Sequence, residues 1–120
     1  MPVQFPAVKA ALDSIIATWT AGNQAPPNLI GKHGATFKWD TQADLLAASG
    51  AGIRLIQPEL IGQTGQGFKA NIVQDLVTGG VGGNPQMPLG GWDSNNGLFY
   101  TLTSPEVVTI IQWIEGGCLP

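Results

Sequence analysis

The sequence predicts one mostly α-helical domain, residues 1–120, with three to five short helices joined by long loops. Three observations support this prediction. A chain of 120 residues suits one domain with one hydrophobic core, because domains typically run to about 100–150 residues. Apolar residues recur at helical spacing in several segments. Most of the 17 glycines and 9 prolines fall between these segments, where they favour turns and loops.

The first predicted helix runs from Pro6 to Trp19. Pro6 suits a first helical turn, and Gly22 suits the end of the helix. The helix carries one apolar stripe, made of Val8, Leu12, Ile15, Ile16 and Trp19. A loop over residues 22–36 should follow, and then a short helix that is capped by Asp40 or Thr41 and runs to Gly50.

The middle of the chain alternates short regular segments with glycine-rich loops. Residues 53–57 suit a short extended stretch that ends at Pro58, and residues 62–67 suit a loop. The next predicted helix carries Phe68, Ile72, Val73 and Leu76 on one face. A second glycine loop covers residues 79–91. The turn sequence at 95–97 favours a small β-hairpin around Trp92 and Phe99.

The last predicted helix has the clearest boundaries. Ser104 is a typical N-cap residue, Pro105 suits the first helical position, and Glu106 suits the positive end of the helix dipole. Two glycines at 116–117 should end the helix. Its apolar face is Val107, Ile110, Ile111 and Ile114.

Composition excludes several classes of protein. Only 11% of the residues are charged, and the five basic ones are scattered, whereas nucleic-acid binding needs clustered positive charge. No stretch approaches the roughly 18 apolar residues of a membrane span. The single cysteine, Cys118, excludes an internal disulfide and a metal site built from several thiolates. Residues 1–5 lack the features of a secretory signal, so we expect a cytoplasmic protein unless the chain is a mature form.

No convincing catalytic set emerges from the residue pattern. His33 is the only histidine, and the chain has no nucleophile-elbow motif whose serine His33 could activate. A Cys118–His33 dyad is a remote alternative, because Cys118 lies near the C-terminus, where chains are usually poorly ordered. Asp40 and Asp44 are four residues apart, but Asp40 is better explained as a helix cap. We therefore expect a non-enzymatic protein in which Cys118 is a small, partly buried thiol.

Four residues are candidates for binding. His33 and Met87 each lie in a predicted glycine-containing loop, and imidazole with thioether is an axial ligand pair of haem iron in many electron-transfer proteins. Trp39 and Trp92 lie in or beside loops. There they would either complete the core, which we favour, or form a ligand or partner surface. Trp19 and Trp113 should both belong to the core.

The C-terminal half resembles a bacterial cytochrome c domain. The resemblance rests on the helix and glycines of residues 69–80, the Met-Pro segment at 86–91, and a final helix that ends in Trp113-Ile114 and glycine. His33-Gly34 also resembles the end of that family's haem-attachment motif. The resemblance implies His33 as the proximal ligand position and Met87 as the distal one, and a final helix packed across the first. Leu29 and Lys32 occupy the positions of the attachment cysteines, so covalent haem is excluded.

Two functions are compatible with these observations. The favoured interpretation is a haem-free protein with a cytochrome c-like fold that acts as a binding or protein-interaction module, as a companion of a redox protein. Its partner would be another protein or a second copy of the chain, and it would need no cofactor. The alternative is an electron-transfer protein that binds haem non-covalently through His33 and Met87.

Overall fold

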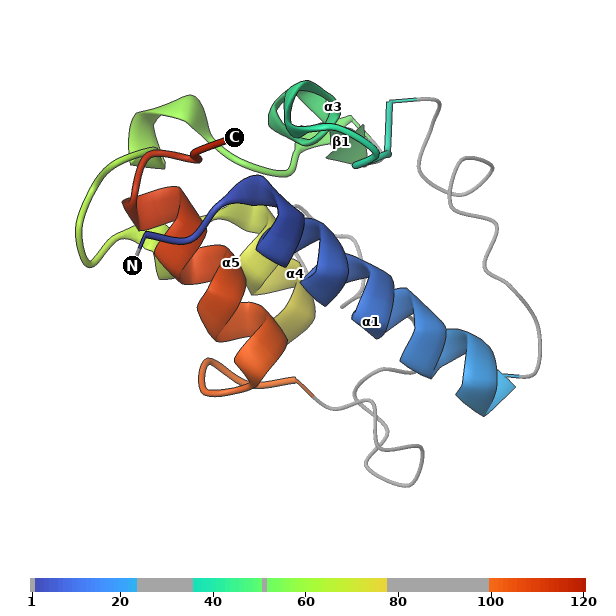
Figure 1. Ribbon diagram of the computed structural model, residues 1–120. Helices are drawn as coiled ribbons and strands as arrows, with labels where there is room; N and C mark the ends of the chain where they lie inside the picture. Colours follow the sequence, from blue (N-terminus) through green and yellow to red (C-terminus); the bar gives the residue numbers. More distant parts are fainter. Residues whose placement is uncertain (1, 24–35, 51, 78–99) are drawn as a thin grey trace.

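The computed structural model describes residues 2–23, 36–50, 52–77 and 100–120 (Figure 1). Within this part of the chain it contains four α-helices, two short 3-10 helices and one two-stranded antiparallel sheet. The mostly α-helical prediction is confirmed. The elements in chain order are α1 (Phe5–Asn23), α3 (Gln42–Ala47), β1 (Ser49–Gly50), β2 (Ile53–Arg54), η1 (Pro58–Leu60), η2 (Gly67–Lys69), α4 (Asn71–Val77) and α5 (Pro105–Glu115).

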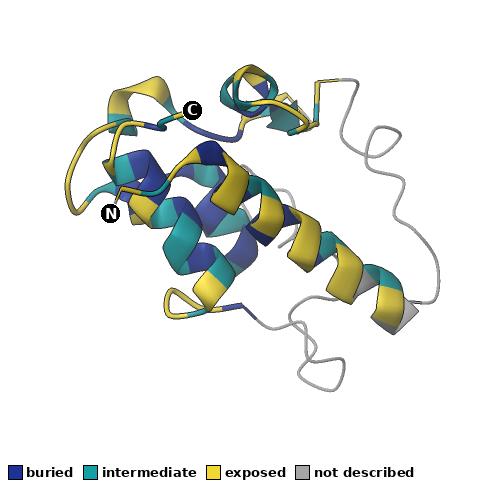
Figure 2. Ribbon diagram, in the orientation of Figure 1, coloured by how far each residue is buried: buried dark blue, intermediate teal, exposed yellow. Residues whose placement is uncertain are grey.

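The two longest helices, α1 and α5, pack against each other, with α4 beside α5 (Figure 1). The buried faces of these helices meet in the interior, and α1 leaves its outer side exposed (Figure 2). Helix α1 begins near the predicted residue but continues four residues past Trp19. The side chain of Trp19 lies outside the described part of the structure. The core includes these fully buried residues of α1 and α5: Val8, Val107, Ile110, Trp113 and Ile114.

Helix α5 has the predicted boundaries, but its first turn differs in detail. Pro105 is the first helical residue and Ser104 occupies the N-cap position. The Ser104 hydroxyl makes no capping bond to the helix; it accepts a hydrogen bond from the backbone N–H of Thr101 at 2.9 Å. At the other end Gly117 has a φ of 101°, which favours glycine and turns the chain away from the helix.

Helix α4 is shorter than predicted because the chain is extended at Ala70, where φ is −61° and ψ is 140°. Ile72, Val73 and Leu76 are buried on one face, as expected. Phe68 does not share that face. It belongs to η2 and is 39% exposed, so its assignment to the apolar face was wrong.

Helix α3 begins where the sequence predicted, and Thr41 rather than Asp40 is its cap. The Thr41 hydroxyl accepts a hydrogen bond from the Asp44 N–H at 3.1 Å, and the Asp44 carboxylate accepts one from the Thr41 N–H at 3.2 Å. The helix ends at Ala47, and the next residues form β1 instead of a last helical turn. β1 pairs with β2, which is the start of the predicted extended stretch. The hairpin predicted around Trp92 and Phe99 lies outside the described residues.

The segment between β2 and α4 is held against the C-terminal end of α5. The Gly62 N–H donates to the carbonyl of Ile114 at 2.8 Å, and the Gly67 N–H donates to Glu115 Oε2 at 3.1 Å. A Cβ atom on Gly67 would lie only 2.8 Å from the carbonyl oxygen of Ile111. The predicted loop at 62–67 is therefore a strap bonded to α5 at its two ends, and its glycine at 67 is required by contact.

The C-terminal residues are ordered, contrary to the expectation for a chain end. The carbonyl of Leu119 accepts hydrogen bonds from the Phe5 N–H at 3.0 Å and from the Trp113 indole N–H at 2.7 Å. Gln4 and Leu119 form a parallel bridge, and the Gln42 side chain donates to the Cys118 carbonyl at 2.6 Å. The tail is ordered because three elements bond to its backbone. Among the described residues, no helix combines the length and apolar character needed to cross a bilayer.

Candidate functional site

Trp39 is the one predicted site residue that the structure describes. It lies in the segment before α3 and is half-buried, with part of its side chain against the core. Its indole N–H donates to Asp13 Oδ1 on α1 at 3.1 Å. The Phe37 ring meets it edge to face, with ring centroids 5.5 Å apart and planes at 77°. The preference for a core role is thus correct in part, since Trp39 also contributes to a surface.

Asp13 is the anchor of this arrangement. Its second oxygen, Oδ2, lies 2.7 Å from the Lys9 ammonium, one helical turn earlier on the exposed side of α1. The hydrogen bond from Lys9 lowers the pKa of Asp13, and the indole N–H of Trp39 lowers it further. The same bond, together with the charges of Asp13 and Asp40, raises the pKa of Lys9. At neutral pH a carboxylate therefore accepts both donors.

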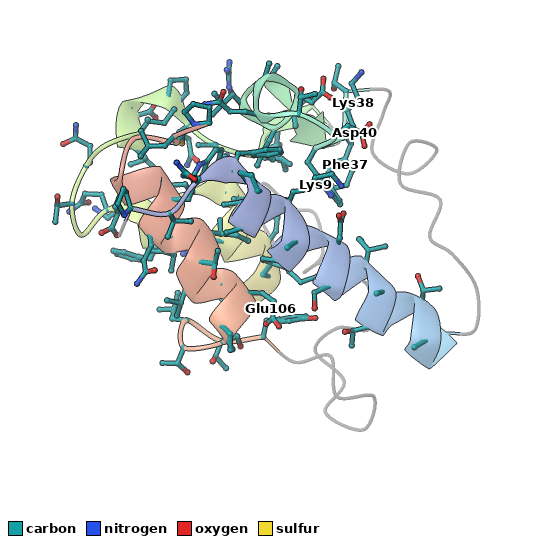
Figure 3. All side chains as sticks on the ribbon, in the orientation of Figure 1. Lys9, Phe37, Lys38, Asp40 and Glu106 are labelled. Carbon is teal, nitrogen blue, oxygen red and sulfur yellow. The ribbon has the colours of Figure 1, made fainter. Side chains whose placement is uncertain are left out.

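A second ion pair lies beside this one. Lys38 Nζ is 3.8 Å from Asp44 Oδ1, and the other oxygen of Asp44 belongs to the helix cap. Figure 3 shows Lys9, Phe37, Lys38 and Asp40 gathered where α1 and the segment before α3 meet. Asp40 precedes the helix, so it does not share a helical face with Asp44. Together these side chains form the Trp39 surface, which consists of Lys9, Asp13, Phe37, Lys38, Trp39 and Asp40.

The other three predicted site residues lie outside the described part of the chain. His33 falls in residues 24–35, and Met87 and Trp92 fall in residues 78–99. The predicted loop at 79–91 lies there as well, and most of the loop at 22–36 falls in the first of these gaps. Where these three residues lie relative to Trp39 is therefore outside the described part of the chain, and the proposed His–Met pair stays a prediction.

Two buried ionisable groups remain neutral near pH 7. Cys118 is 2% exposed, and burial raises the pKa of its thiol to about 11, so the nucleophilic thiolate is scarce. Burial also raises the pKa of Tyr100, as does the charge of Glu106, while a hydrogen bond with Thr18 lowers it. These groups behave as core residues. Cys118 is more deeply buried than the sequence suggested.

Asp75 is an ionisable group that the sequence-based predictions missed. It is half-buried on α4, and loss of water contact raises the pKa of its carboxyl group to about 6. The signal was present in the sequence, because Asp75 sits between residues of the apolar face, Val73 and Leu76. Asp13 was also missed, although its spacing of four residues from Lys9 is typical of a helical ion pair.

The described residues contain no cluster of three or more histidine, cysteine, aspartate or glutamate side chains able to hold a metal ion. Comparison of the chain with models of protein families, with curated protein sequences and with solved structures found no match. A function for this chain therefore has to be inferred from the Trp39 surface and from the sequence.

Proposed function

We propose that this chain is a non-enzymatic binding module that contacts another protein, or a second copy of itself, through the Trp39 surface. The observation that carries the proposal is the fixed position of Trp39, whose indole N–H is bonded to an ionised Asp13 on α1. Tryptophan is among the residues that contribute most to protein interfaces. A ring held in place before binding loses little conformational freedom when a partner arrives, which favours association.

The charges around Trp39 suit the rim of an interface. Interface centres are depleted in charged residues, while their rims are polar and accessible to water. Lys9 and Asp13 neutralise each other at 2.7 Å, and their side chains are 39% and 53% exposed. Lys38 is similarly placed near Asp44. Aromatic rings bordered by paired charges thus offer apolar contact area together with polar contacts at its edge.

We also propose that the module has a cytochrome c-like fold without attached haem and serves as the companion of a redox protein. The sequence resemblance supports this fold, and so does the packing of α1 against α5, since a final helix packed across the first is what the resemblance implies. Leu29 and Lys32 stand where cysteines would bind haem covalently. A fold alone does not confer the function that is usual for it, so a protein with a cytochrome c-like fold can bind a partner without carrying haem.

Self-association and partner binding are tested separately. Sedimentation velocity over a concentration series measures self-association. A photo-crosslinking amino acid at the exposed position Lys38, used in extracts of the source cells, captures a different partner. The same amino acid at Phe68 is the matched control, because Phe68 is exposed but belongs to η2, outside the Trp39 surface. We expect association or crosslinking through position 38 and none through position 68.

Substitutions then link the binding to Trp39. Trp39→Ala removes the ring, whereas Asp13→Ala keeps the ring and removes the acceptor of its indole N–H. We expect each to weaken association by about tenfold, which corresponds to about 1.4 kcal/mol. Phe68→Ala should leave association unchanged. Equal losses of association in all three variants would refute the proposal. It would also be refuted if the protein is a monomer and crosslinks equally at positions 38 and 68, or at neither.

The second candidate is an electron-transfer protein with non-covalent haem. What favours it is that the only histidine and the only methionine after Met1 both occur beside glycine or proline, as His33-Gly34 and Met87-Pro88. The described residues do not supply these ligands, and the one described sulfur, Cys118, is a buried thiol with a pKa of about 11. The residues that would hold iron thus belong to the segments 24–35 and 78–99.

Haemin titration separates the two candidates. If the second candidate is correct, added haemin gives a Soret shift that His33→Ala abolishes and that Met87→Ala alters, because loss of the thioether removes one axial ligand and keeps the histidine. The unrelated surface variant Phe68→Ala is the control. Absence of a Soret shift, or a shift that survives His33→Ala, excludes haem binding through this pair and leaves the interaction module as the function.

A further inference from the structure

We draw no further inference here: the strongest candidate, the surface patch around Trp39 between α1 and α3, belongs to the site already described, and nothing in the structure shows what covers it.

Discussion

Replacing Asp75 with asparagine should stabilise the protein at neutral pH. Asparagine has nearly the same shape as aspartate but carries no charge. In the folded protein the carboxyl group of Asp75 is half-buried on α4, and its pKa is about 6, against an ordinary value of 3.8. Above that pH the folded state must hold a negative charge that is partly removed from water, which costs free energy. The variant avoids this cost.

The direction of the pH dependence follows from the two pKa values. Between about pH 4 and pH 6 the folded state binds more protons at Asp75 than the unfolded state does, so stability falls as the pH rises. A difference of this size corresponds to about 3 kcal/mol at about 1.4 kcal/mol per pKa unit. Because water still reaches part of the side chain and screens its charge, we expect a gain of about 1 kcal/mol.

The assay is urea unfolding of wild type and Asp75→Asn, followed by tryptophan fluorescence at several pH values. The variant should gain stability near pH 7, and the gain should vanish below about pH 4, as Asp75 becomes protonated in the unfolded as well as the folded wild type. Asp13→Asn is the control of opposite sign. In the wild type, Lys9 lowers the pKa of Asp13, so ionised Asp13 stabilises the folded state at pH values above its unfolded pKa. That contribution is lost as the pH falls, so Asp13→Asn should destabilise the protein near pH 7 and have less effect at low pH. The reasoning is refuted if Asp75→Asn is no more stable than wild type at neutral pH, or if its gain in stability is the same at every pH.

Two further predictions concern contacts with α5. Gly67→Ala should reduce the free energy of unfolding by about 1–3 kcal/mol, because its Cβ would lie 2.8 Å from the carbonyl oxygen of Ile111 and 2.9 Å from Glu115 Cγ. Urea unfolding measures this change, and an unchanged midpoint would show that the strap can move away from α5. Trp113→Phe should cost about 1–3 kcal/mol, because it removes the indole donor to the Leu119 carbonyl and shrinks a fully buried side chain. Thermal unfolding tests this second change, and an unaltered Tm contradicts it.

Helices whose signals are local could be predicted from the sequence. Helix α5 begins at Pro105 and ends before two glycines, as expected, because proline and glycine restrict or release the backbone whatever surrounds them. Most described residues of the two apolar stripes are buried for the same reason, since helical spacing alone places them on one face: Val8, Leu12 and Ile15 in α1, and Val107, Ile110 and Ile114 in α5. For α5 the sequence was sufficient, whereas α1 continues past its predicted end at Trp19.

Features that depend on distant contacts could not be predicted. Phe68 fits the apolar spacing of α4, but the contact of Gly67 with α5 holds the preceding turn outside that helix. The amide of Gln57 accepts the Asn71 N–H at 2.8 Å and so binds the first residue of α4 from another segment. In the same way, nothing local to Trp39 reveals that its indole finds Asp13 on α1.

The bridge between Gln4 and Leu119 also constrains the order of folding during synthesis. The Phe5 N–H, at the start of α1, has its partner carbonyl on Leu119, which is made more than a hundred residues later. Contacts between residues so far apart in the chain close a very long loop and form slowly. On the ribosome, the face of α1 that packs against α5 therefore lacks this partner until α5 has emerged. During that interval this apolar face is open to aggregation and to chaperones.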